Sequence, residues 1–387
     1  MLSFDKFILD NGLKVIVCSD RNTPLVTVNL LYDVGAKDEN PDKTGFAHLF
    51  EHLMFGGSVN IPHYDKPLQE TGGENNAFTN NDFTNYYVNL PVSNIEMAFW
   101  LESDRMLQLA ISDRSLEVQR NVVIEEYKQR YLNQPYGYTW LLLRPLAYKV
   151  HPYRWATIGR DISHIEKAEL SDVEEFFLRH YSPNNAILTV VGNVSLDYIR
   201  ELSEKWFSTI ERRDVKKRNL PAEPEQTEER RLTVERDVPY DYIFKSYHIC
   251  KRTDPEYYSF DLITDILSNG KSSRLYQELV KKKKYFSEIS AYLTGDIERG
   301  LLVINGKLIQ GIKIEDAENV IDEEVQKLKD NIVPDNELQK VKNKAESNIK
   351  LSETNSLNNA INLSYHELLG NAEDINHEAE KYLAVSS

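Results

Sequence analysis

Regularly spaced hydrophobic residues near the N-terminus predict two β-rich runs followed by a helix. The runs cover residues 7–20 and 23–35, with a turn expected at Asn11-Gly12 inside the first, and they predict paired strands. Residues 44–55 follow, with apolar residues three and four positions apart. This segment stops at Gly56-Gly57, as expected just past the end of a helix. It is therefore predicted to be helical.

The rest of the chain alternates between strand-like and helical patterns. In the first half these patterns predict a hairpin over 71–91, helices over 94–110 and 114–135, a buried strand over 187–194 and a helix over 195–207. In the second half they predict strands over 240–250, 286–296 and 300–308, helices over 257–269 and 272–282, and further helices to the end. The order is similar in the two halves, which favours a duplicated α+β fold.

A charged segment separates the two halves. Residues 211–235 carry two prolines and lack apolar periodicity until their end. We therefore expect an N-terminal domain over 1–212, a charged linker over 213–232, and a related C-terminal domain over 233–387 that is incomplete at its end. At 387 residues the chain is long enough for two domains with separate cores.

Composition and charge narrow the classes of function. The chain has 41% hydrophobic and 28% charged residues, a balance typical of folded globular proteins. Acidic residues outnumber basic ones 61 to 46, and the net charge of −15 disfavours binding to nucleic acid or to an anionic membrane. The run Lys281-Lys282-Lys283-Lys284 is interpreted as a solvated helix end. Neither nucleic acid nor membrane is expected as a partner.

Cysteine usage and hydropathy bear on location. Cys18 and Cys250 are the only cysteines, so neither a disulfide framework nor a paired-cysteine metal site is expected. No window approaches 18 apolar residues, and no signal peptide is visible. We therefore expect a soluble, cytoplasmic protein.

Two histidines lie four residues apart in the predicted helix over 44–55. Residues three and four apart share a helix face, so His48, Glu51 and His52 can point into one small volume. Two imidazoles on one face suit a catalytic zinc ion, which needs three protein ligands and an open position for water. A hydrogen-bonded core histidine is the alternative for either residue alone. Burying all three groups without a metal or partners costs on the order of several kcal/mol, which favours a zinc site completed from elsewhere.

The segment His48-Leu49-Phe50-Glu51-His52 resembles the inverted zinc motif, HxxEH, of the pitrilysin or insulinase family of metallopeptidases. Further similar segments extend over most of the chain, and they are NGLKVIV at 11–17, Asn76–Thr79, VVIEE at 122–126, TIG at 157–159, YSPNN at 181–185 and VVGN at 190–193. The resemblance implies a zinc endopeptidase with one Zn²⁺ per chain and Glu51 as the base that activates water. It also implies two related domains with mostly antiparallel sheets and helices on one face, together forming half of a clamshell, with zinc in the first domain.

The same resemblance implies the other residues of the zinc site. It assigns Glu126 as the third zinc ligand, with Glu125 as the alternative, although a lone glutamate in a charged helix usually faces solvent. The position seven residues before Glu126 is usually glutamate in the family and is Gln119 here. We expect Gln119 to support the site by hydrogen bonding without supplying charge.

The resemblance also suggests how a peptide is bound. Residues Asn76, Ala77, Phe78 and Thr79 are similar to the family's edge strand, which pairs with an extended peptide substrate. The substrates implied are short or unfolded peptides that enter an enclosed chamber. An ordinary hairpin arm is the alternative for this segment.

One feature of the family members that act alone is missing. Those members carry an Arg and a Tyr seven residues apart in the C-terminal half, which contact substrate and the developing oxyanion. The aligned positions here are Val280 and Ser287, while Arg274 and Tyr276 lie nearby but face different sides of a helix. The departure implies a related partner subunit that carries the Arg and Tyr, in a heterodimer, or else a homodimer. The alternative functions are a non-catalytic structural subunit and a peptide-binding subunit with structural zinc.

Overall fold

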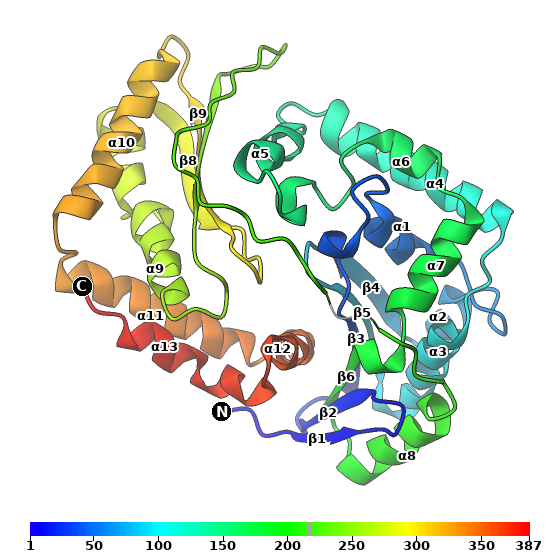
Figure 1. The fold of residues 1–387 in the computed structure, drawn as a ribbon. Coiled ribbons are helices and arrows are strands. Elements are labelled where there is room, and N and C mark those ends of the chain that lie inside the picture. Colours follow the sequence, from blue (N-terminus) through cyan, green and yellow to red (C-terminus); the bar gives the residue numbers. More distant parts are fainter. Residues whose placement is uncertain (216–217) are drawn as a thin grey trace. The chain divides into compact units, whose positions relative to one another are not determined.

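The computed structural model describes residues 1–215 and 218–387, which form two compact units (Figure 1). Unit 1 comprises Met1–Arg231 and Ser352–Asn376, and unit 2 comprises Leu232–Leu351 and His377–Ser387. Each unit contains a mostly antiparallel sheet with helices packed against it. This arrangement confirms the predicted α+β fold with two related domains.

Unit 1 is built on a six-stranded sheet with the strand order β1-β2-β6-β3-β5-β4. The strands are β1 (Asp5–Ile8), β2 (Lys14–Ser19), β3 (Leu25–Tyr32), β4 (Glu74–Thr79), β5 (Thr84–Pro91) and β6 (Ala186–Gly192). All neighbours are antiparallel except β2 and β6, which run parallel. The prediction that the two N-terminal runs pair with each other is wrong, because β6 lies between β2 and β3. Every residue of β6 is buried, so this strand takes a central position.

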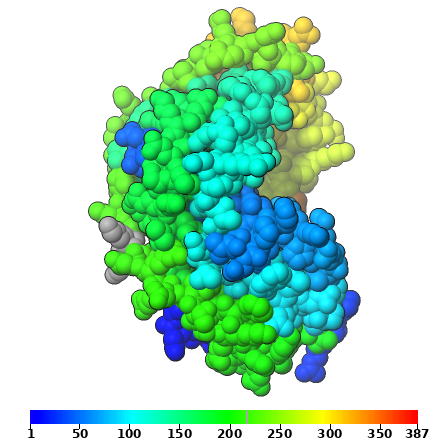
Figure 2. Space-filling model, turned by 90° about the vertical axis from the view of Figure 1, so that its right-hand side faces the viewer, coloured from blue at the N-terminus to red at the C-terminus, as the bar shows by residue number. Residues whose placement is uncertain are grey.

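Helices cover both faces of this sheet. Those of unit 1 are α1 (Phe46–Leu53), α2 (Asp65–Glu70), α3 (Ile95–Leu107), α4 (Asp113–Tyr127), α5 (Thr139–Ala147), α6 (Ile162–Glu166), α7 (Leu170–His180), α8 (Leu196–Phe207) and α12 (Ser356–Leu369), with short 3₁₀ turns at η1 (Ala36–Asp38) and η4 (Pro152–Arg154). The main core lies between the sheet and the helices α1, α3, α4, α7 and α8. In Figure 2, cyan residues that include α3 lie beside green residues that include α8.

The opposite face of the sheet is covered by α12, which lies far along the chain. Leu363 is fully buried against β2, β3 and β6, and Asn29 Nδ2 donates to Ser364 Oγ over 2.9 Å. Without α12, apolar side chains on this face would be exposed to water. For this reason Ser352–Asn376 packs with unit 1, although it was expected within the C-terminal domain over 233–387.

The charged segment 213–232, in its described part, lies almost wholly in unit 1. Its charged side chains bind backbone groups there: Arg213 Nη1 donates to Tyr181 O over 2.7 Å, and Arg230 Nη1 donates to Ala147 O over 2.8 Å. These hydrogen bonds hold the segment without a hydrophobic core of its own. Its role as a domain linker stays a prediction.

Unit 2 repeats part of the order seen in unit 1. Its strands are β7 (Tyr242–His248), β8 (Phe286–Leu293) and β9 (Leu301–Leu308), and its helices are α9 (Tyr257–Ser268), α10 (Ile314–Asp330), α11 (Asp335–Ser352) and α13 (Glu378–Ala384). The strand order β7-β9-β8 matches β3-β5-β4. In both sets helices lie between the first and the second strand along the chain: α1 and α2 in unit 1, and α9 with the π-helix Tyr276–Lys282 in unit 2. Within 1–215 and 218–387, no helix has both the length and the apolar character required to cross a bilayer.

Candidate metal centre

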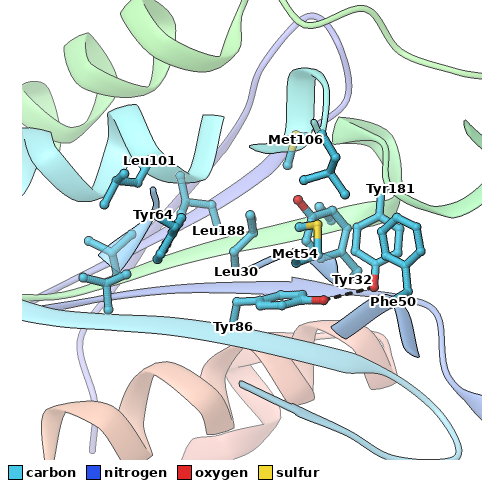
Figure 3. Packing of buried hydrophobic residues seen from close by; sticks show 14 of the residues in the cluster. Leu30, Tyr32, Phe50, Met54, Tyr64, Tyr86, Leu101, Met106, Tyr181 and Leu188 are labelled. Carbon is cyan, nitrogen blue, oxygen red and sulfur yellow. Dashed lines mark hydrogen bonds between the residues drawn. The ribbon is translucent and has the colours of Figure 1, made fainter. Parts of the chain in front are cut away.

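The predicted helix over 44–55 forms α1, whose apolar side faces the sheet. The buried side chains of α1 are Phe46, Ala47, Leu49, Phe50 and Leu53. Figure 3 shows Phe50 beside Tyr181, with ring centroids 4.4 Å apart, and the hydroxyls of Tyr181 and Tyr86 at 3.1 Å. The three polar residues of the HxxEH motif are only partly buried and lie outside this apolar side. Packing of the apolar side therefore fixes the direction in which the motif points.

Three polar side chains from two helices meet beside α1. The Nε2 atoms of His48 and His52 lie 3.3 Å apart. Glu126 Oε2, from α4, lies 3.6 Å from His48 Nε2 and 3.4 Å from His52 Nε2. Among the residues described, this is the one group of three His, Cys, Asp or Glu side chains arranged closely enough to hold a metal ion. The structure thus brings together the three ligands that the family resemblance implies.

These separations fit a tetrahedral zinc ion. Two ligand atoms about 2.05 Å from zinc, at a tetrahedral angle, lie about 3.3 Å from each other. The three observed separations run from 3.3 to 3.6 Å. Two imidazoles and one carboxylate are also a donor set that zinc enzymes use. The residues present therefore suit zinc in chemistry and in spacing.

The electrostatics of the cluster favour the protonation states that a metal requires. Burial lowers the pKa of His48 to about 4, so its imidazole is neutral near pH 7 and keeps a free lone pair. A hydrogen bond with His52 lowers the pKa of Glu126, so its carboxylate is ionised. Histidine binds a metal ion as neutral imidazole, and glutamate binds it as carboxylate. His48 and Glu126 therefore need no change of charge to bind a metal ion.

Glu51 lies between the two histidines in sequence but outside the group of three ligand atoms. Burial raises the pKa of Glu51, and a hydrogen bond with Thr79 at the end of β4 offsets part of the rise. A carboxylate with a raised pKa is a better proton acceptor near neutral pH than an exposed one. Its surroundings therefore suit general acid–base chemistry.

The neighbours of Glu126 on α4 occupy different environments. The Glu125 side chain is 61% exposed and pairs with Lys128 Nζ over 2.7 Å, so α4 presents Glu126 and not Glu125 to the histidines. Gln119 is partly buried two turns earlier on the same helix. The expected support of the site by Gln119 stays a prediction.

Arg130 is a site residue that the sequence reasoning missed. Its Nη1 lies 2.9 Å from Glu126 Oε1, the carboxylate oxygen that does not approach the histidines. Arg130 belongs to a π-helical turn, Lys128–Leu132, that continues α4, and such turns are frequent at functional sites. The available signal was its position four residues after Glu126, which places both side chains on one helix face.

Glu39 is a second residue that the sequence reasoning missed. Its side chain is buried ahead of α1, where Oε2 accepts from Gly45 N over 2.9 Å and Oε1 accepts from Ala47 N over 2.8 Å. Gly45 begins the helix at a φ of 89° and offers no side chain to cap it. Glu39 therefore caps α1 from a distance, at a spacing that no standard capping pattern covers.

The segment expected to bind substrate lies at an edge of the sheet. Residues Asn76–Thr79 belong to β4, whose neighbour is β5, and no described strand pairs with its outer side. An exposed edge offers backbone groups to which an extended peptide can add as a further strand. Thr79 also connects this strand to Glu51. The substrate-binding role of Asn76, Ala77, Phe78 and Thr79 stays a prediction.

In unit 2, the two positions at which the family carries Arg and Tyr are occupied by Val280 and Ser287. Val280 packs against the core of unit 2, and Ser287 Oγ donates to Lys307 O over 3.2 Å. Nearby, Arg274 is bound to Glu337, with Nη2 and Oε2 2.6 Å apart. Neither Val280 nor Ser287 can supply a guanidinium or phenol to an oxyanion.

A pH-dependent stability is expected from Glu39. Burial raises the pKa of Glu39 from 4.5 to about 8, so the folded protein binds this proton more tightly than the unfolded chain does. Between these two pH values the unfolded chain ionises first, and the free energy of unfolding falls as pH rises. Relative to the Glu39→Gln variant, which cannot titrate, the wild type should lose on the order of a few kcal/mol between pH 4.5 and pH 8. Urea unfolding of metal-free protein at both pH values measures this difference, and an equal pH slope for the two proteins would contradict it.

The sequence matches two parts of one peptidase family. Residues 14–138 match Insulinase (Peptidase family M16), and residues 167–345 match the Peptidase M16 inactive domain. The zinc protease PqqE of Helicobacter pylori is 31% identical over 340 residues, which cover 86% of this chain and 76% of PqqE.

Solved structures are similar over the whole chain. The crystal structure of a protease from Helicobacter pylori superposes with a TM-score of 0.93 at 27% identity, covering 100% of this chain and 94% of the other. The periplasmic protease PqqL from Escherichia coli superposes with a TM-score of 0.78 at 18% identity, and there the match covers 100% of this chain but 45% of PqqL. Together with the HxxEH helix and the similarity to PqqE, these matches confirm the resemblance. The chain belongs to the insulinase family of zinc proteases, peptidase family M16.

Proposed function

We propose that this chain is a zinc endopeptidase that hydrolyses short or unfolded peptides, with His48, His52 and Glu126 as its zinc ligands. The observation that carries the proposal is the set of three ligand atoms at tetrahedral separations, with Glu51 beside them on the same helix. The family and the names of its relatives support a zinc-dependent protease. Catalysis by this chain, and its substrates, are our inference.

The chain's own residues would carry the proton transfers. Bound zinc supplies Lewis acidity, which lowers the pKa of a water molecule toward 7 and polarises a peptide carbonyl. Glu51 takes a proton from the attacking water and returns it to the nitrogen of the leaving amine. Arg130 holds Glu126 Oε1 and so keeps Oε2 directed at the histidines. The peptide bond is cleaved with water as the only other reactant.

Backbone pairing with β4 is the proposed means of holding substrate. Its outer edge is free among the described residues, and main-chain hydrogen bonds recognise an extended peptide whatever its side chains are. A folded protein without an exposed edge strand has to unfold locally before it can pair in this way. This constraint selects short or unfolded peptides.

Replacing Glu51 separates a hydrolase from a subunit that merely binds peptide or zinc. The Glu51→Gln variant should keep its zinc and its peptide binding but lose turnover by about 10²-fold or more, because Gln cannot accept the proton. Zinc content by atomic absorption and cleavage of a quenched fluorescent peptide measure the two effects. Turnover unchanged by the substitution would exclude catalysis by Glu51 and favour the non-catalytic alternatives.

Two adjacent glutamates provide a matched test of the ligand set. Glu126→Gln should weaken zinc binding at least about tenfold, whereas Glu125→Gln should leave it unchanged, because Glu125 points to solvent and to Lys128. Competition with a zinc chelator measures both dissociation constants under one set of conditions. Loss of zinc from the Glu125 variant alone would transfer the ligand role to that residue.

A related subunit is proposed to supply what Val280 and Ser287 lack. This fold also occurs as one half of a longer chain, since the first half of PqqL was solved separately and matches 98% of this chain. Pairing with a second such fold, in a heterodimer or a homodimer, would enclose the substrate and bring Arg and Tyr donors to the oxyanion. Both the partner and the chamber are part of our proposal.

Mixing experiments test the need for a partner. The chain alone should cleave peptide slowly, and a related chain with Arg and Tyr at the aligned positions should raise the rate by about 10²-fold or more, as oxyanion donors do elsewhere. Activity is measured against the ratio of the two chains, and light scattering gives the size of the complex. If the chain alone is as active as the mixture, the need for a heterologous partner is disproved.

A further inference from the structure

We propose that the short segment Ala36–Glu39 positions both parts of the site, with Glu39 holding the metal-binding helix α1 and Lys37 holding the substrate strand β4. Neither residue belongs to the group of three candidate ligands, and their hydrogen bonds go to Gly45, Ala47 and Asp82, so both are positioning residues. The inference rests on the proposed function, because it assigns roles within that site. The inference goes beyond the proposed function by naming the residues that set the distance between α1 and β4.

The first part of the argument is the way in which α1 begins. Glu39 binds the amides of Gly45 and Ala47, and Ala47 directly precedes His48. On the other side of this turn, a Cβ at Gly45 would lie 2.7 Å from Ile158 O. The first turn of α1 is thus held between the buried Glu39 side chain and a neighbouring backbone, which leaves it little freedom to shift along its axis.

The second part is a buried ion pair at the turn between β4 and β5. Lys37 Nζ donates to Asp82 Oδ1 over 2.7 Å, and the two side chains are only 5% and 4% exposed. Tyr153 OH donates to the same oxygen over 2.6 Å. The backbone of this segment adds hydrogen bonds from Ala36 N to Asn80 O and from Lys37 N to Asn81 O, at 3.1 and 2.9 Å.

The same turn approaches the chain just ahead of the segment. A Cβ at Gly35 would lie 2.6 Å from the backbone of Asn81, so only glycine allows this approach. Lys37 and Glu39 are two residues apart, with Lys37 inside the short 3₁₀ turn η1 and Glu39 directly after it. A movement of β4 is therefore transmitted through less than one turn of helix to the start of α1.

The connection matters because β4 and α1 also meet at Glu51. Elements α1 and β4 are in contact, and Thr79, the last residue of β4, lies close enough to the Glu51 carboxyl group to lower its pKa. The position of β4 relative to α1 hence sets both the register of a bound peptide and the direction of the base. The buried ion pair of Lys37 and Asp82 is costly, and apolar side chains would fill this space at lower cost, so a positioning role accounts for its presence.

The proposed role of Glu39 is tested by measuring zinc affinity. In Glu39→Gln the side-chain amide NH₂ cannot accept from a backbone N–H, so one of the two hydrogen bonds is lost. The zinc dissociation constant, from chelator competition at a temperature where circular dichroism shows folded protein, should rise at least about tenfold. The KM for a peptide should stay within about twofold of the wild type. Glu201→Gln, an exposed glutamate of α8, is the matched control and should change neither quantity.

The proposed role of Lys37 is tested by the opposite result, a change in the KM for a peptide without a change in zinc affinity. Lys37→Met removes the charge and keeps most of the length of the side chain, so the KM for a peptide should rise at least about tenfold while the zinc dissociation constant stays unchanged. Should this variant fail to fold because the buried Asp82 loses its cationic partner, the double variant Lys37→Met with Asp82→Asn removes both charges and serves the same comparison. The split between KM and zinc affinity is a result that general destabilisation does not produce.

Hydrogen exchange makes the inference testable even if the proposed function fails. In metal-free protein, Glu39→Gln should speed the exchange of the Gly45 and Ala47 amides, and Lys37→Met should speed that of the β4–β5 turn, at least about tenfold over the control. Wild-type protein that binds no zinc would refute the proposed function but leave this comparison intact. Unchanged exchange in both variants, or zinc affinity and KM that shift together in each, would overturn the positioning roles.

Discussion

The contact between α1 and α4 is the constraint on which the candidate metal centre depends. His48 and His52 come from one helix and Glu126 from the other, and their ligand atoms must lie within about 3.3 to 3.6 Å of one another to share a tetrahedral ion. A shift of either helix by about 1 Å would break this geometry. Most of unit 1 can be understood as a support that holds these two helices in place.

The support below α1 is an unusual core that contains a buried charge. Arg105 forms a bidentate pair with Glu102 and lies 4.3 Å from the ring centroid of Tyr86. Tyr86 binds Tyr181 through their hydroxyls, and Tyr181 packs on Phe50 of α1. Buried pairs of this kind add little net stability, but they restrict how the rings can pack. Rigid packing at this point keeps the HxxEH face of α1 directed away from the sheet.

The pattern of hydrophobic residues predicted the positions of helices and strands better than it predicted which of them lie side by side. The helix over 44–55, the hairpin over 71–91 and the strand over 187–194 all form close to the predicted positions. The pairing of the first two β-rich runs was wrong, because side-chain periodicity shows which residues are buried but not which strand lies beside another. The placement of α12 on the sheet of unit 1 was likewise hidden, since an amphipathic helix does not reveal which apolar face it covers.

For the site, the sequence by itself determined that His48, Glu51 and His52 share one helix face, because the helical repeat fixes that relation locally. Glu126 was implied only by family resemblance, and only the tertiary structure distinguishes it from Glu125, because one of the two adjacent side chains turns toward the histidines and the other pairs with Lys128. Glu39 and Lys37 became visible only in the folded chain. Their partners lie in other turns and strands, and such long-range hydrogen bonds depend on how the elements pack, which local sequence does not encode.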